Sequence, residues 1–100
     1  MNRVAKVDNP ASITGIYPRI VNYSAKWCGP CKAIAAEVEK LANTHPDLNF
    51  FKIDIDEHND HASDMGITAV PTFILYKNIL SEPEVLRGAD ITKLRRLINY

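Results

Sequence analysis

The chain alternates between two hydrophobic periodicities, and this alternation restricts the folds that it can adopt. Runs rich in β-branched and aromatic residues, such as 19–24 (RIVNYS) and 72–76 (TFILY), are typical of strands. Other segments repeat apolar residues every three or four positions, and the longest predicts this helical face: Cys31, Ile34, Ala35, Val38, Leu41 and Ala42. Strands that alternate with helices favour a partly parallel sheet with helices on both faces.

The complete pattern predicts the order β-α-β-α-β-α-β-β-α. The expected strands cover residues 3–7, 19–24, 48–55, 72–76 and 85–87. The expected helices lie between Asn9 and Pro18, from the turn at 27–32 to His45, from Glu57 to Met65 with Gly66 as cap, and after the cap Asp90. The last two strands are close in sequence, so we expect them to pair antiparallel. No repeat or linker interrupts residues 1–100, which we interpret as one domain.

Composition excludes several classes of partner and compartment. The chain has no formal net charge, so no strong field attracts it to nucleic acid or to a membrane surface. Residues 1–8 contain no apolar run of the kind that a secretory signal needs, and no stretch approaches the ~18 apolar residues of a membrane span. We therefore expect a cytoplasmic protein that recognises its partners by shape and apolar contact.

The only two cysteines, Cys28 and Cys31, point to chemistry rather than to stability. A bridge between residues this close in sequence closes a very small loop and stabilises a fold little. At a helix start, unpaired backbone N–H groups and the helix dipole favour Cys28 as a thiolate. Cys31 lies one turn further along, where we expect it to be more shielded. Cys28 would attack a partner's disulfide, and Cys31 would then release the reduced partner.

The histidines offer an alternative use for the cysteines. His58 and His61 could complete a Cys₂His₂ zinc site, but 26 residues separate Cys31 from His58 and two separate the histidines. This spacing does not fit the usual zinc pattern. We predict no metal site, and we interpret both histidines as part of a solvated helix face.

Two motifs resemble the thioredoxin family. One is WCGPCK at 27–32, which follows a predicted strand and opens a helix, and the other is VPTF at 70–73, at the start of a buried strand. The resemblance covers roughly residues 20–98. It implies the thioredoxin fold, a central mixed β-sheet flanked by helices on both faces. It also implies a monomeric protein-disulfide reductase without a bound cofactor, which a thioredoxin reductase or similar donor recharges and which acts on disulfide-containing client proteins.

The resemblance also implies roles for residues around the dithiol. Pro71 would follow a cis peptide bond and would keep the pair from binding metal, while Lys32 and Lys52 would support the site. The substrate-docking surface would consist of Trp27, Gly29, Pro30, Val70, Pro71, Thr72, Gly88 and Ala89.

The sequence departs from the family pattern at three places. Asn22 stands where the family usually has a buried aspartate, Ser24 replaces an aromatic residue, and the loop at 77–79 reads Lys-Asn-Ile instead of Lys-Asn-Gly. We expect Asn22 to lie under the dithiol, where it cannot titrate. These differences leave open a second function, that of a binding or assembly module with incidental redox activity.

Overall fold

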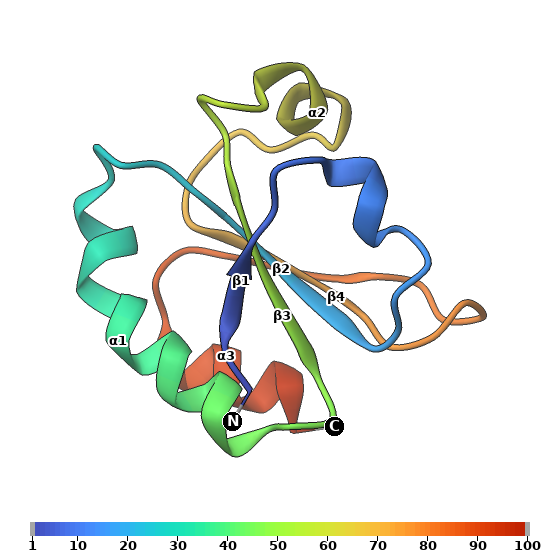
Figure 1. Cartoon of the computed structure of the whole chain (residues 1–100). Helices are drawn as coiled ribbons and strands as arrows, with labels where there is room; N and C mark the ends of the chain where they lie inside the picture. Colours follow the sequence, from blue (N-terminus) through green and yellow to red (C-terminus); the bar gives the residue numbers. More distant parts are fainter. Residues whose placement is uncertain (1, 100) are drawn as a thin grey trace.

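The computed structural model describes residues 2–99, which form a mixed sheet with helices on both faces (Figure 1). Within these residues no helix is both long enough and apolar enough to span a bilayer. The elements in chain order are β1 (Val4–Lys6), the 3-10 turn η1 (Pro10–Ile13), β2 (Arg19–Ser24), α1 (Gly29–Thr44), β3 (Asn49–Asp54), α2 (Asn59–Asp64), β4 (Thr72–Tyr76), β5 (Glu84–Arg87) and α3 (Ile91–Ile98).

The strands lie in the order β1-β3-β2-β4-β5, with β2 at the centre. β3 runs parallel to both β1 and β2, whereas β4 runs antiparallel to β2 and to β5. The predicted mixed sheet is therefore confirmed, together with its antiparallel last pair. The register places Asn22 between Lys52 of β3 and Phe73 of β4. Because β4 is antiparallel to β2, its first residues lie beside the end of β2, where the chain leaves for the cysteines.

Local signals set the helix boundaries. α1 begins directly after Cys28, has Pro30 in its first turn and ends just before Pro46, as proline chemistry predicts. The Asp90 carboxylate accepts a hydrogen bond from the Lys93 backbone N–H at 3.0 Å, which caps α3. Gly66 follows α2 with φ of +72°, a conformation that glycine adopts without strain.

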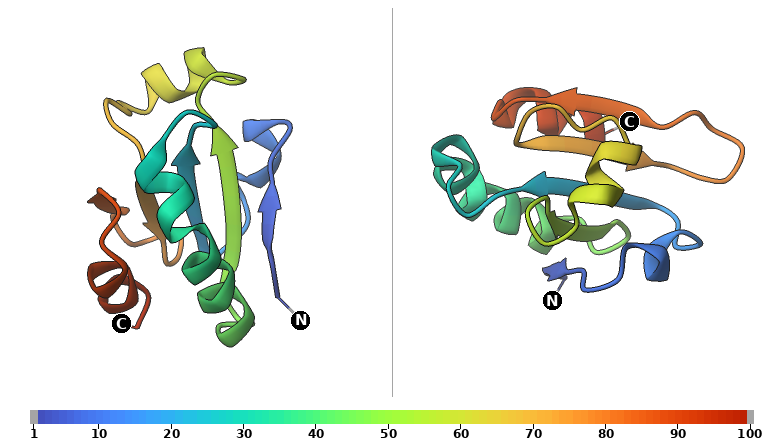
Figure 2. Two further views of the ribbon diagram at one scale, coloured as in Figure 1. Left: turned by 90° about the vertical axis from the view of Figure 1, so that its left-hand side faces the viewer. Right: turned by 90° about the horizontal axis from the view of Figure 1, so that it is seen from above.

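Two hydrophobic cores lie on opposite faces of the sheet. α1 and α3 cover one face, which Figure 2 shows from two directions. That core is formed mainly by Ile20, Val38, Leu41, Phe50, Phe73, Leu75, Leu94 and Ile98. The second core, on the face of η1, contains Val7, Ile13, Val21, Tyr23, Ile53 and Ile74. Successive β2 side chains therefore alternate between the two cores, and Asn22 falls on the α1 side with Ile20.

The first predicted helix is wrong in extent, because it is a single 3-10 turn that ends at Ile13. Arg19 provides the reason. Its buried guanidinium donates hydrogen bonds to the carbonyls of Thr14 and Ile16, at 3.2 and 3.1 Å, so these carbonyls are used outside any helix. The guanidinium also lies over the ring of Tyr76, 3.8 Å from its centroid.

The loop between β4 and β5 contains the Lys-Asn-Ile sequence at residues 77–79. The Asn78 side chain orders it by accepting a hydrogen bond from the Leu80 backbone N–H at 2.9 Å. Ile79 and Leu80, at its tip, are 79% and 94% exposed. The loop lies at the opposite end of β4 from Pro71.

Candidate redox site

The two cysteines form a disulfide at the start of α1. Cys28 is the N-cap residue of the helix, and Cys31 lies in its first turn, with 5.3 Å between the two Cα atoms. The Cys31 backbone N–H donates a hydrogen bond to the Cys28 Sγ at 3.1 Å. This amide has no partner within the helix, so the helix N-terminus directs a donor at the first sulfur. The expectation that the helix start favours negative charge on Cys28 rests on this geometry.

The burial of the two cysteine residues differs from the prediction. Cys28 is 3% exposed and Cys31 is 7% exposed, so the expectation that Cys31 is more shielded is wrong for the disulfide form. Cys28 packs against Ala25 and Val70, and the Val70 carbonyl oxygen lies 3.7 Å from its Sγ. Cys31 borders a cavity on the other side. The sulfurs therefore differ in what they face rather than in depth.

An exposed surface surrounds Cys28. Trp27 is 67% exposed, and its indole N–H donates a hydrogen bond to the Asp56 carboxylate at 2.8 Å, which orients the ring beside the motif. Gly29 and Pro30 are exposed, and Val70 is half-buried. A client protein can reach these groups together.

The segment that follows Val70 fits the sequence expectation in part. The Val70–Pro71 peptide bond is cis, as predicted, and the Gly88 backbone N–H donates to the Pro71 carbonyl at 2.9 Å. However, Pro71 and Thr72 are both buried, and the Thr72 hydroxyl donates to the Ala69 carbonyl. Their side chains are therefore inaccessible to a client in this structure, because Thr72 begins the inner strand β4 and Pro71 directly precedes it, and their docking role stays a prediction. The structure leaves these predicted docking residues at least partly accessible: Trp27, Gly29, Pro30, Val70, Gly88 and Ala89.

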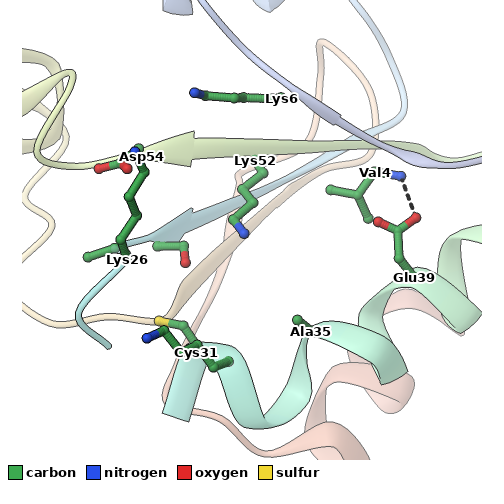
Figure 3. A pocket seen from close by; sticks show the side chains of 11 residues that line it. Val4, Lys6, Lys26, Cys31, Ala35, Glu39, Lys52 and Asp54 are labelled. Atoms are coloured by element: carbon green, nitrogen blue, oxygen red, sulfur yellow. Dashed lines mark hydrogen bonds between the residues drawn. The ribbon is translucent and has the colours of Figure 1, made fainter. Parts of the chain in front are cut away.

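A cavity of about 580 Å³ opens beside Cys31, between α1 and the sheet (Figure 3). The helix turns the small side chain of Ala35 toward this space, so Ala35 is exposed and its prediction as a core residue was wrong. Four lysines and two carboxylates contribute to the lining, which is Val4, Lys6, Ser24, Ala25, Lys26, Cys31, Lys32, Ala35, Glu39, Lys52 and Asp54. The predicted supporting residues Lys32 and Lys52 are thus brought together with Cys31.

Asn22 lies in register with Lys52, which lines this cavity, and its predicted place under the dithiol stays a prediction. It is half-buried in the central strand, and its Oδ1 is fully buried without a hydrogen-bond partner among the residues described. A side chain amide at this position neither gives up nor takes a proton at ordinary pH.

The histidines are not a solvated helix face, which corrects the sequence interpretation. The Tyr23 hydroxyl lies 2.9 Å from His61 Nε2, and their rings stack with centroids 5.7 Å apart. Burial lowers the pKa of His61 and raises the pKa of Tyr23. His58 Nε2 is buried without a partner among residues 2–99.

Within the same residues, no three His, Cys, Asp or Glu side chains are grouped so that they could hold a metal ion. The alternation of β2 could have indicated that Tyr23 faces α2.

Comparison with known proteins decides the family. A sequence model of the family described as Thioredoxin matches residues 10–100. The chain belongs to the thioredoxin family. Thioredoxin-1 of Schizosaccharomyces pombe is 43% identical over 79 residues, which are 79% of this chain and 76% of that protein. Thioredoxin Asp f 28 of Aspergillus fumigatus is 34% identical over 99 residues, 96% of this chain and 92% of that one. A solved structure of Plasmodium falciparum thioredoxin superposes with a TM-score of 0.87 at 38% identity, covering 96% of this chain and 97% of the other.

Membership of the thioredoxin family identifies the function of the disulfide. This thioredoxin is a dithiol–disulfide oxidoreductase, and Cys28 and Cys31 are its redox-active pair. It reduces protein disulfides, and the electrons reside on the two sulfurs, so this thioredoxin chemistry needs no bound cofactor. The sequence predicted both the family and the fold from the motifs at 27–32 and 70–73.

We expect iodoacetamide to alkylate the reduced protein first at Cys28, and faster than it alkylates free cysteine at neutral pH. The reason is the Cys31 N–H and the helix dipole, both of which stabilise a thiolate at Cys28. Peptide mapping after brief labelling identifies the modified sulfur. Preferential labelling of Cys31 would show that the attacking sulfur has been assigned to the wrong residue.

Proposed function

We propose that this thioredoxin is a monomeric electron carrier of a reducing compartment such as the cytoplasm, which reduces client-protein disulfides and is recharged by a thioredoxin reductase. One observation supports this most directly. The attacking sulfur is the N-cap of α1, where it accepts a backbone hydrogen bond beside the exposed indole of Trp27. A nucleophile stabilised in this way, next to an apolar surface, suits transient reaction with many partners.

The reaction has two displacement steps. The Cys28 thiolate attacks one client sulfur, a Cys28–client disulfide forms, and the second client sulfur leaves with an electron pair. The Cys31 thiolate then attacks Cys28, which restores the Cys28–Cys31 disulfide and expels the remaining client sulfur. The client gains two electrons, and the cysteine pair loses two.

We propose that clients dock on the accessible surface around Cys28. Its apolar part is the ring of Trp27 together with Pro30 and Val70, and Gly29 and Gly88 present little side-chain bulk to an approaching backbone. The absence of net charge supports recognition by shape and apolar contact. Recognition of this kind does not require a charged patch that attracts one class of client.

The proposal is tested by following insulin reduction with two electron sources. We expect turnover with dithiothreitol and also with NADPH and a thioredoxin reductase, and loss of both in Cys28→Ser. Activity with dithiothreitol alone would contradict recharging by a reductase of this type. Absence of both activities, with a biological role that persists in Cys28→Ser, would instead favour a binding module.

A further inference from the structure

We propose that Asp54 accepts the proton that Cys31 must lose before it attacks Cys28, a role that Asn22 cannot perform. The inference rests on the proposed function, because it concerns the second of its two displacement steps.

The second displacement step, in which Cys31 attacks Cys28, requires a base near Cys31. An unperturbed cysteine has a pKa near 8.5, so only a few per cent is thiolate at neutral pH. The free N–H at the start of α1 points at the Cys28 sulfur and does not assist Cys31. Asn22 is in register with Lys52 and its side chain lies on the same face of the sheet as Ile20, but its amide does not accept protons at ordinary pH.

The cavity beside Cys31 limits the choice of base. Its lysines are proton donors when charged, which leaves two carboxylates as acceptors, Glu39 and Asp54. Glu39 lies eight residues after Cys31 in α1, roughly 12 Å along the helix axis at 1.5 Å per residue. Its carboxylate also accepts the Val4 backbone N–H at 3.1 Å, which ties it to β1.

Asp54 is better placed than Glu39 to accept the proton of Cys31. It ends β3, is buried, and pairs in register with Ser24, the residue before Ala25, which packs against both cysteines. Its Oδ1 accepts the Asp56 backbone N–H at 2.8 Å. Within residues 2–99 its Oδ2 accepts no hydrogen bond, so one oxygen remains able to take a proton.

The charges around the cavity act on both groups. Asp54 is faced by Lys6 from β1, Lys26 from the loop before α1, and Lys52 from β3, while Lys32 and Glu39 belong to α1. Lys6 is itself paired with Glu57 at 3.1 Å. Figure 3 shows Lys52 pointing into the space between the sheet and α1. The lysines, which outnumber the carboxylates in the lining, stabilise a developing thiolate on Cys31.

The attack of Cys31 on Cys28 moves one proton and one electron pair. The Cys31 S–H proton passes through solvent in the cavity, which is large enough to hold water and is bordered by charged side chains, to the Asp54 carboxylate. The electron pair left on Cys31 forms the bond to the Cys28 Sγ, and the Cys28–client bond breaks. The client sulfur leaves with the electron pair and takes up a proton, and Asp54 returns its own proton to solvent.

A single-turnover reaction with a chromogenic aromatic disulfide, dithiobis-nitrobenzoate in excess, separates the two steps. Attack by Cys28 releases one coloured thiolate, and attack by Cys31 releases the second. We expect Asp54→Asn to slow the second release at neutral pH by at least about tenfold, with the first release unchanged. We also expect the second release to rise more steeply with pH in Asp54→Asn than in the wild type, because solvent must then take the proton.

The matched control is Glu39→Gln, which removes an equal charge from the same cavity and should slow neither release. Asparagine at position 54 can still accept the Asp56 N–H, and Asp54→Ser repeats the test if Asp54→Asn does not fold. A purely electrostatic role for Asp54 predicts the opposite sign, because removing a negative charge favours the Cys31 thiolate. A second release in Asp54→Asn that is equal to or faster than that of the wild type overturns the inference. Lack of the first release in the wild type would instead overturn the proposed function.

Discussion

Cys31→Ser is expected to lose all turnover and to remain attached to client proteins through Cys28. The variant keeps the attacking sulfur and the N-terminus of α1, so the first displacement proceeds, but no sulfur remains to release the client. Non-reducing electrophoresis of a lysate treated with the purified variant should show high-mass adducts that disappear on reduction.

Cys28→Ser is the matched control for this trap. It retains one buried cysteine of the same pair, but that cysteine borders the cavity and lacks the hydrogen bond that Cys28 accepts. We expect few adducts from it. Adducts in equal amount from both variants would show that the sulfurs are interchangeable, and the two-step order would have to be abandoned.

The second large effect is expected for Asn22→Asp, which should destabilise the protein at neutral pH by about 1–3 kcal/mol. The Asn22 Oδ1 is buried without a partner among the residues described, so an aspartate would place a poorly compensated charge there. Burial disfavours the charged form and raises the pKa of such a carboxyl group above its unfolded value near 3.9.

The sign of the pH dependence follows from that shift. A carboxyl group with a raised pKa in the folded state binds more protons folded than unfolded, so the penalty is complete at high pH and shrinks as pH falls toward 4. Urea denaturation at pH 5 and pH 8 measures this difference. Asn59→Asp makes the same change at an exposed site and should cost little at either pH. If Asn22→Asp costs nothing at pH 8, the side chain at position 22 is not confined beneath the cysteines.

Local patterns explain what could be predicted from the sequence. The strands, the caps of α1 and α3, and the family motifs depend on residues a few positions apart, so their boundaries agree with the structure within a few residues. The side of the sheet on which Asn22 lies also follows from a strand periodicity of two. These features do not depend on which distant segments pack together.

The predictions that were wrong depend instead on contacts between segments that are distant in the sequence. Burial of Cys28 results from Val70, which is 42 positions away, and exposure of Ala35 results from the space left between α1 and the sheet. The contact between Tyr23 and His61 joins β2 to α2 across 38 positions. Periodicity identifies the face on which a side chain lies, but it does not identify what covers that face.

The placement of β4 has a practical consequence. One end of this strand follows the segment that touches Cys28, and the other leads into the loop with exposed Ile79 and Leu80. Five residues of strand separate these ends by about 17 Å at 3.3 Å per residue. A fluorophore, a surface tether or an inserted peptide at 79–80 would therefore lie away from the docking surface around Cys28. The carrier could then be immobilised on an electrode or a resin with that docking surface turned away from the support.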